Sequence, residues 1–394
     1  MIVLKILQYI FLIYLGFSSL YILVFSFAGL FRLKAKSRTA ESLNKFAVLI
    51  PAYKEDEVIL EVAEEATKQN YPPEKFDVIV IADSFQPQTI RALQSLPVTL
   101  LEVSFEKSTK SKALNAAMHE MGDEYDVAVV LDADNIMEAD FLQKMNAAFK
   151  KDNIAVQGHR VAKNTNTSFA LLDAISEEIN NHIFRHGHRV LGMSAALIGS
   201  GMGIRYNYFK QMMQSIDAVG GFDKEIELKL LRERHLIEYL PDAFVYDEKV
   251  QKAEVFQNQR RRWLSAQLHY FSKDIFKATW HLISRGNLDY FDKAIQLIQP
   301  PRVMLMGLLM FLSLISIIVN PLVFTIIWLG ILLACIMALL FATPGRFYNP
   351  KTLGALATLP RALGLMFLSL MKLRGANREF IHTEHISSKE DLNQ

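Results

Sequence analysis

Two carboxylates, Asp132 and Asp134, stand one residue apart directly after an apolar, valine-rich run at residues 127–131. Such a run is typical of a buried strand. Alternate residues of a strand point the same way, so both carboxylates could face one hard cation and the phosphate groups that it carries. The spacing therefore predicts a phosphate-binding site that also holds a divalent metal ion.

A second string, Gln259-Arg260-Arg261-Arg262-Trp263, gathers three guanidinium groups beside an indole. Guanidinium groups match the geometry of phosphates, and an indole ring can stack on a sugar. These residue types suit a pyrophosphate leaving group and a bound sugar ring. Because apolar segments lie at both ends of the chain, the two strings together indicate an enzyme that acts on an activated donor at a membrane surface.

The composition narrows the class of protein. The chain has 394 residues, enough for one large domain together with membrane elements. Its 43 basic and 41 acidic residues nearly balance, so the charge does not indicate a nucleic acid partner. Cys335 is the single cysteine, which excludes an internal disulfide and fits a reducing compartment.

Three apolar segments are long enough to cross a bilayer as helices. One lies within residues 1–32, and two fill residues 303–342 with a break at Asn320-Pro321. The basic cluster Arg32–Arg38 is expected to stay in the cytoplasm, which leaves both large charged regions in the cytosol. A cleavable signal peptide is the alternative for the first segment, although its apolar region would be shorter. We expect an integral protein of a plasma or inner membrane.

Two further segments are expected at the membrane surface. Residues 274–301 mix apolar and basic side chains, which favours interfacial helices over a surface helix of the soluble domain. Residues 353–374 are apolar but contain Pro360 and Arg361, so an interfacial or re-entrant helix is favoured over a fourth span. Residues 375–394 are expected to form a cytosolic tail.

Residues 44–273 alternate strand-like and helix-like patterns, which predicts an α/β domain with a mostly parallel sheet. Ligands of open α/β sheets bind outside the carboxyl ends of the strands. Pro51–Glu55, Asp83 and the paired aspartates each follow such an end, so together they predict a nucleotide site. The expected strands are 46–50, 76–82, 98–103 and 127–131.

Other residues suggest further roles. Lys110–Asn115 opens a helix whose amides and lysines could attract phosphate. Glu225 is the preferred candidate for a general base, ahead of Glu227, whereas Asp223 is expected to cap the helix that follows. Gly199–Gly203 is expected to be a flexible turn.

Three histidines, His182, His186 and His188, occur in a basic, loop-like stretch. No carboxylate or cysteine stands at a suitable ligand spacing, so solvent-facing or acceptor-side histidines are favoured over a zinc site.

Taken together, these strings resemble those of the family 2 inverting glycosyltransferases, in particular the membrane-embedded branch related to cellulose, chitin and hyaluronan synthases. The resemblance covers residues 44–270 and rests chiefly on Asp132-x-Asp134 and Gln259-x-x-Arg262-Trp263. It implies a GT-A type fold and the transfer of one sugar from a nucleotide-diphosphate donor, expected to be a UDP-sugar, with Mg²⁺ or Mn²⁺.

The resemblance also implies roles for the matching residues. Asp134 would bind the metal. The residues that would contact the donor are Pro51, Tyr53, Glu55, Asp83, Lys112 and Asp132. Those that would close over the pyrophosphate and the acceptor sugar are Gln259, Arg262 and Trp263. Glu225 stands where many relatives have the catalytic aspartate, so the base would have a longer side chain.

The expected acceptor is a growing polysaccharide or another saccharide hydroxyl, and the alternative is non-processive transfer to a membrane lipid. Three or four membrane segments are too few to line a polymer channel alone. This favours the lipid acceptor, or else a homo-oligomer or an export partner that would complete the channel. Phe380–His385 is faintly similar to the gating loop of the synthases, and an ordinary tail is at least as well supported. An inactive scaffold or transporter is disfavoured because the spans contain few polar residues.

Overall fold

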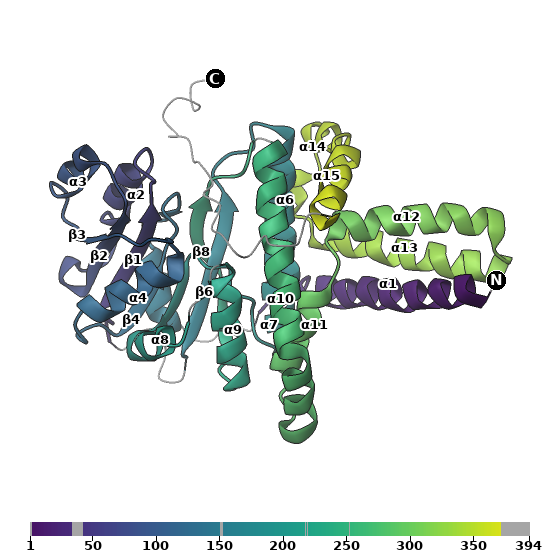
Figure 1. The fold of residues 1–394 in the computed structure, drawn as a ribbon, viewed down its shortest axis with the longest axis horizontal. Helices are drawn as coiled ribbons and strands as arrows, with labels where there is room; N and C mark the ends of the chain where they lie inside the picture. The colour runs from purple at the N-terminus through teal and green to yellow at the C-terminus, as the bar shows by residue number, and fades with distance from the viewer. Residues whose placement is uncertain are drawn as a thin grey trace.

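The computed structural model describes residues 2–33, 42–149, 153–216, 218, 220–251 and 253–371. Figure 1 shows the sheet and its covering helices at the left of the molecule. Three long helices extend together to the right. Between the sheet and the long helices stand α6 (Ser168–Asn180) and α10 (Ala253–Arg285). Most of the basic cluster that follows the first apolar segment, and the whole 375–394 tail with its Phe380–His385 string, lie outside the described residues.

The sheet has eight strands in the order β3-β2-β1-β4-β7-β6-β8-β5. The first four strands in this order are mutually parallel, β6 is parallel to β8, and β7 and β5 run antiparallel to their neighbours. The α/β prediction with a mostly parallel sheet is therefore confirmed. The strands are β1 Phe46–Tyr53, β2 Phe76–Asp83, β3 Thr99–Val103, β4 Val127–Val130, β5 Ile136–Met137, β6 Ala155–Ala162, β7 Met202–Arg205 and β8 Ile237–Asp247.

Both faces of the sheet are covered, which explains why its strands are apolar without alternation. In β1, Ala47 and Leu49 pack into one core, whereas Val48 and Ile50 pack into the other. Each buried valine, leucine or isoleucine side chain stabilises the fold by about 1.5–3 kcal/mol, so the sheet is a rigid support for its loops. The covering helices are α2 Ile59–Ala66, α3 Pro87–Leu93, α4 Lys110–Glu120, α5 Phe141–Ala148, α8 Tyr206–Met213 and α9 Phe222–Arg232.

The histidine-containing stretch is helical, so the expectation of a loop was wrong. α6 continues as a π-helix, η2 (Asn181–Gly187), and then as α7 (His188–Val190). His188 is fully buried and stacks on Phe25 of α1, with ring centroids 3.6 Å apart. The histidines here serve contacts with the first long helix rather than facing solvent.

Three helices in the described residues are long and apolar enough to cross a membrane. They are α1 (Ile2–Ala28), α12 (Arg302–Val319) and α13 (Leu322–Ala342). α13 packs against both of the others, and many of their outward side chains are exposed, as a lipid environment would require.

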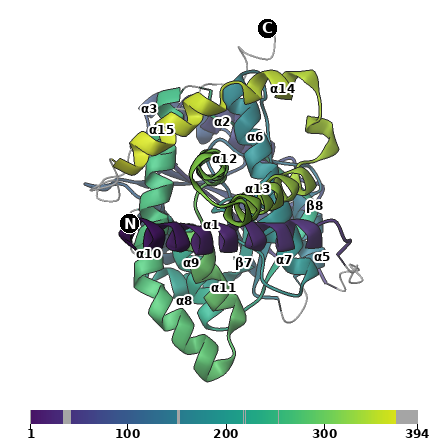
Figure 2. The same cartoon turned by 90° about the vertical axis from the view of Figure 1, so that its right-hand side faces the viewer.

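Four helices lie near the base of these three. α10 packs along α11 (Leu288–Ile298), and α15 (Leu359–Met371) contacts both α10 and α12. α14 (Pro350–Leu356) packs on α6. Figure 2 looks along α12 and shows α10, α14 and α15 arranged around its end. The segment predicted as one interfacial helix, residues 353–374, thus begins in α14 and continues in α15.

Candidate active site

The predicted loops do meet at one edge of the sheet. Tyr53 at the end of β1 pairs in register with Asp83 at the end of β2, and β4, which ends just before Asp132, pairs with β1. Asp83 is buried and accepts a hydrogen bond from Ser84 Oγ at 2.9 Å. Pro51 lies inside β1. The prediction that these segments share one edge is confirmed, while their roles toward a nucleotide stay predictions.

Two turns at this edge hold strained backbone. Lys54 has φ +54° and Ser84 has φ +62°, a region that side chains other than glycine rarely adopt. Lys54 N donates to Asp83 O at 3.1 Å, which ties the two turns together. Such strain is typical of positions whose geometry serves a ligand. Glu55 directly follows the first of these turns.

Of the two lysines at the start of α4, Lys110 contacts Asp132 and Lys112 does not. Thr109 caps α4 by accepting from Lys112 N at 3.2 Å, which places Lys110 at the first helical position. Lys110 Nζ donates to Asp132 and, at 2.7 Å, to Gly199 O. Lys112 Nζ instead donates to Lys107 O at 2.9 Å on the exposed side of the helix. Of the two lysines, only Lys110 is thus placed to meet a phosphate bound at Asp132.

The glycine-rich turn is a fixed support of the site. Fully buried Ser200 accepts from Asp132 N at 2.9 Å and from Asn135 Nδ2 at 3.1 Å. Gln157 Nε2 donates to Ser200 O at 2.9 Å, and its Oε1 accepts from Ile198 N at 3.1 Å. Gly201 has φ +60°, and a Cβ there would lie 2.8 Å from a Val245 methyl. The turn therefore requires glycine and holds the backbone of the paired aspartates in place.

The donor set at the paired aspartates fits a metal that arrives with its substrate. In the described part of the chain, no three His, Cys, Asp or Glu side chains gather to hold a metal. Asp132 and Asp134 are the two carboxylates that follow β4, and buried Asn135 Oδ1 has no hydrogen-bond donor among the described residues. Mg²⁺ commonly takes one or two carboxylates and completes its shell with water and substrate phosphates. These oxygens are compatible with that arrangement.

Three acidic residues of α9 point in different directions. The helix cap is Gly221, so Asp223 lies in the first turn and is not the expected cap. Asp223 packs against Gly199, where an added Cβ would lie 3.4 Å from the Asp223 Cβ. Burial raises the pKa of Asp223, but Lys224, Lys293 and Lys110 outweigh it and hold the pKa below its usual value. Asp223 is therefore an ionised carboxylate beside the Lys110–Asp132 pair.

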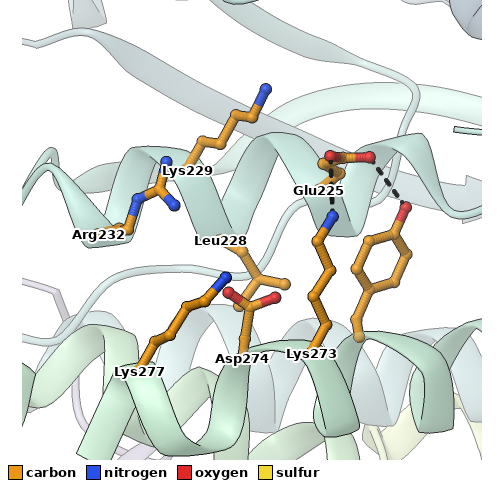
Figure 3. A pocket seen from close by; sticks show the side chains of 8 residues that line it. Glu225, Leu228, Lys229, Arg232, Lys273, Asp274 and Lys277 are labelled. Atoms are coloured by element: carbon orange, nitrogen blue, oxygen red, sulfur yellow. Dashed lines mark hydrogen bonds and ion pairs between the residues drawn. The ribbon is translucent and has the colours of Figure 1, made fainter. Parts of the chain in front are cut away.

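Glu225, the base expected from the sequence, faces α10 instead. Its carboxylate accepts from Tyr270 Oη at 3.2 Å and pairs with Lys273 Nζ at 3.3 Å (Figure 3). Glu227 is buried, pairs with Lys293 at 2.8 Å, and accepts from Leu197 N at 3.2 Å. Burial raises the pKa of Glu227 despite Lys293. Both glutamates have structural partners of their own.

The Gln259–Trp263 motif lies on α10 and packs toward α6. Arg260 donates to Asp173 of α6 and stacks over the Trp263 ring, 4.5 Å from its centroid. Gln259 Oε1 is buried without a donor among the described residues. Burial also lowers the pKa of Arg262. The indole thus contacts a guanidinium of its own motif.

A buried charge network extends from this motif toward the paired aspartates. Glu177 of α6 accepts from Arg160 at 2.9 Å and from Arg185 at 3.3 Å, and Lys249 pairs with Asp247 at 2.5 Å. Burial raises the pKa of Glu177, but Arg160, Lys249 and Arg185 outweigh it and hold the pKa far below normal. Despite burial, the negative charge of Asp132 also helps to raise the pKa of Arg160. These pairs join the sheet edge to the helices at the base of the spans.

Sequence reasoning included Lys110 among the lysines that could attract phosphate but preferred Lys112 for the donor. It expected Asp223 to cap the helix and preferred Glu225 as the base. It did not single out Ser200 as a support of the paired aspartates. A signal for Ser200 was its place between two glycines, since a polar residue there can turn toward the backbone of a neighbouring loop.

Comparison with known proteins identifies the family. Residues 44–266 match the model of the family described as glycosyltransferase like family 2. The beta-monoglucosyldiacylglycerol synthase of Trichormus variabilis is 27% identical over 236 residues, covering 56% of this chain and 48% of that protein. "Probable glycosyltransferase YdaM" of Bacillus subtilis is 24% identical over 236 residues, covering 57% of this chain and 55% of its own length. The chain spans about half the length of these curated relatives.

Among solved structures, mannosyltransferase PcManGT from Pyrobaculum calidifontis, in complex with GDP-Man and Mn²⁺, aligns over 83% of this chain and 99% of its own. The identity is 16% and the TM-score is 0.47.

Proposed function

The chain belongs to glycosyltransferase family 2 and has a GT-A-like α/β fold, and we propose that it transfers a sugar with inversion from a nucleotide-diphosphate donor to an acceptor hydroxyl at a membrane surface. The observation that carries this proposal is the Lys110–Asp132 pair at the carboxyl edge of the sheet, with Asp223 packed beside it. Lys110 and the paired aspartates thus lie at the edge where α/β sheets bind nucleotides. The ionised Asp223, the candidate base, lies next to them.

For the donor, the nucleotide would lie along the β1, β2 and β4 edge, against Pro51–Glu55 and Asp83. Asp132 and Asp134 would hold the divalent ion, Mg²⁺ or Mn²⁺, which when bound neutralises charge on the departing diphosphate. Lys110 Nζ adds a second positive charge to the same oxygens, and because it is already oriented by Gly199 O it needs little rearrangement.

For the base, we favour Asp223 over Glu225. The acceptor oxygen attacks the anomeric carbon, the bond from that carbon to the diphosphate oxygen breaks, and the hydroxyl proton passes to a carboxylate. Asp223 is beside Lys110 and Gly199, whereas the Glu225 carboxylate is bonded to Tyr270 and Lys273 on the far face of α9. One displacement inverts the centre without a covalent enzyme intermediate.

For the acceptor, a membrane lipid is favoured by the similarity to the beta-monoglucosyldiacylglycerol synthase of Trichormus variabilis, whose name denotes a glycosylated diacylglycerol. Three candidate spans with α10 across their base support an active site close to the membrane. Elongation of a polysaccharide is the second candidate, because the Gln259–Trp263 motif on α10 resembles that of the polysaccharide synthases. The cytosolic placement of the catalytic domain is part of the same proposal.

The test is a donor and acceptor screen with the purified full chain. UDP-glucose, UDP-galactose, UDP-N-acetylglucosamine and GDP-mannose would each be paired with diacylglycerol in mixed micelles or with a short oligosaccharide, with Mg²⁺ or Mn²⁺ present. Mass spectrometry should detect one glycolipid, absent with the Asp134→Ala variant. Extension of the oligosaccharide instead would support the second candidate. Failure of every pair to give a metal-dependent product would oppose transfer.

A further inference from the structure

A second binding region lies between α9 and α10, on the opposite side of α9 from Asp223. A small pocket lined by both helices adjoins a wider groove of about 400 Å³. Arg232 from α9 and Lys277 from α10 line both spaces, and Figure 3 shows them on the two facing helices. The two hollows therefore form one continuous region, which we call the α9–α10 groove.

The polar end of the α9–α10 groove is positively charged. Four basic and two acidic side chains line the small pocket. Both acids are already engaged, Glu225 by Lys273 and Asp274 by Tyr290 Oη. Within the described residues, neither Arg232 nor Lys277 has a carboxylate at ion-pair distance. Burial and the nearby guanidinium groups of Arg285, Arg232 and Arg234 also lower the pKa of His281, as a concentration of positive charge should.

The other end of the α9–α10 groove is apolar and open. Phe276 and Trp280 line it, and their side chains, with Ile283, are 85%, 66% and 74% exposed. Spacings of four and three residues place all three on one face of α10. An exposed row of large apolar side chains next to lysine and arginine is the pattern of a helix in contact with lipid headgroups.

The position of α10 agrees with such a contact. Figures 1 and 2 show this helix crossing the base of the three long helices rather than running parallel to them. If α1, α12 and α13 insert in a membrane, as proposed above, α10 lies near the membrane–water boundary. Basic side chains there can reach lipid phosphates while aromatic rings contact the acyl region.

We propose that the α9–α10 groove binds an anionic phospholipid, with its phosphate between Arg232 and Lys277 and its apolar part along Phe276 and Trp280. The bound lipid bridges the helix that carries Asp223 and the helix that carries Gln259–Trp263, so it would stabilise their relative position. It is not the sugar acceptor, because Asp223 and Lys110 lie on the other side of α9.

The experiment measures binding and does not depend on transfer activity. The purified full chain, in a zwitterionic detergent, is titrated with phosphatidylglycerol, with phosphatidylcholine and with inorganic phosphate. Retained lipid is counted by native mass spectrometry, and the unfolding temperature is followed in parallel. The test variant is Arg232→Gln/Lys277→Gln. The matched control, Lys68→Gln/Arg91→Gln, removes the same two charges from the distant α2 and α3 region.

We expect one phosphatidylglycerol to be retained preferentially by the wild type and the control, with a rise in unfolding temperature. The test variant should bind it roughly tenfold more weakly or worse, because it removes both cations that would contact the lipid phosphate. Phe276→Ser/Trp280→Ser should weaken lipid binding too. Should the test variant misfold, Lys277→Gln alone, at an exposed position, should show an intermediate loss.

Three results would overturn the proposal. They are equal affinity of the test variant and the control for phosphatidylglycerol, equal retention of phosphatidylcholine, and equal stabilisation by inorganic phosphate. The last would mean that a soluble anion, not a lipid, occupies the α9–α10 groove.

Discussion

Asp223 and Glu225 lie in the same first turn of α9 but serve opposite sides of it. Asp223 packs against Gly199, which accepts a hydrogen bond from Lys110, whereas Glu225 is held by Tyr270 and Lys273 of α10. Residues two apart on a helix are separated by about 200° around its axis, so only one of them can face the sheet edge. This single relationship changes the expected identity of the base.

The roles of Asp223 and Glu225 can be distinguished by replacing each carboxylate with the amide of the same shape. Asp223→Asn should lower turnover by roughly 100-fold or more while donor binding persists, because the amide cannot accept a proton. Glu225→Gln should retain most of the activity, since its partners Tyr270 and Lys273 can still donate to the amide oxygen. Steady-state rates of nucleotide diphosphate release would measure both. The reverse pattern would restore Glu225 as the base.

Lys110 and Lys112 form a second matched pair. Lys110→Gln should raise the KM for the donor by roughly tenfold or more, because it removes a charge-assisted contact at the phosphates. Lys112→Gln should stay within about twofold of the wild type, since its ammonium bonds to Lys107 O away from Asp132. Donor saturation curves at fixed acceptor give both values. Equal losses in the two variants would contradict the placement of Lys110.

Metal dependence tests the paired aspartates. EDTA should abolish transfer, and added Mn²⁺ or Mg²⁺ should restore it, because the diphosphate would otherwise leave without charge neutralisation. Asp134→Ala should not be rescued by either ion. Product formation with chelated enzyme is the measurement. Full activity in EDTA would remove the metal from the proposed mechanism.

Membrane orientation can be measured on intact cells. A tag at Met1 should react with an impermeant reagent, and a tag after Lys351 should react only after permeabilisation, because basic flanks stay in the cytoplasm. Labelling in the opposite pattern would place the catalytic domain outside and exclude a cytosolic donor.

Acid should destabilise the buried charge network. The cations around Glu177 and Asp247 hold the pKa of each carboxyl below its unfolded value of about 4. Their stabilising contribution is thus fully present above about pH 5 and is lost as the pH falls below about 4. The unfolding temperature should be flat from pH 7 to 5 and then fall.

Glu177→Gln checks the origin of that fall. It should lower the unfolding temperature at pH 7, because three cations lose a buried carboxylate, at a cost of about 3 kcal/mol. Its pH dependence should be shallower than that of the wild type. Glu65→Gln, at a partly exposed position away from the network, should match the wild type throughout. An unchanged acid response in Glu177→Gln would mean that other groups cause it.

The local pattern of the sequence was sufficient for the strands and for the edge of the site. β-Branched runs with nearby turn residues predicted β1, β2 and β4, and their parallel order placed Tyr53, Asp83 and Asp132 together. Apolar length alone predicted α1, α12 and α13. These features follow from the sequence because strand alternation, turn chemistry and span length are properties of short continuous segments.

Tertiary packing alone decided which side chain of each motif faces the site. Lys110 or Lys112, and Asp223 or Glu225, are equally compatible with their helices. The choice depends on how α4 and α9 rotate against the sheet and against α10. The supporting roles of Ser200 and Gln157 could not be predicted from local sequence either, because the hydrogen-bond partners Asp132 and Ser200 lie more than 40 residues away in the chain. Helix rotation is set by the sum of many long-range core contacts, which no short segment contains.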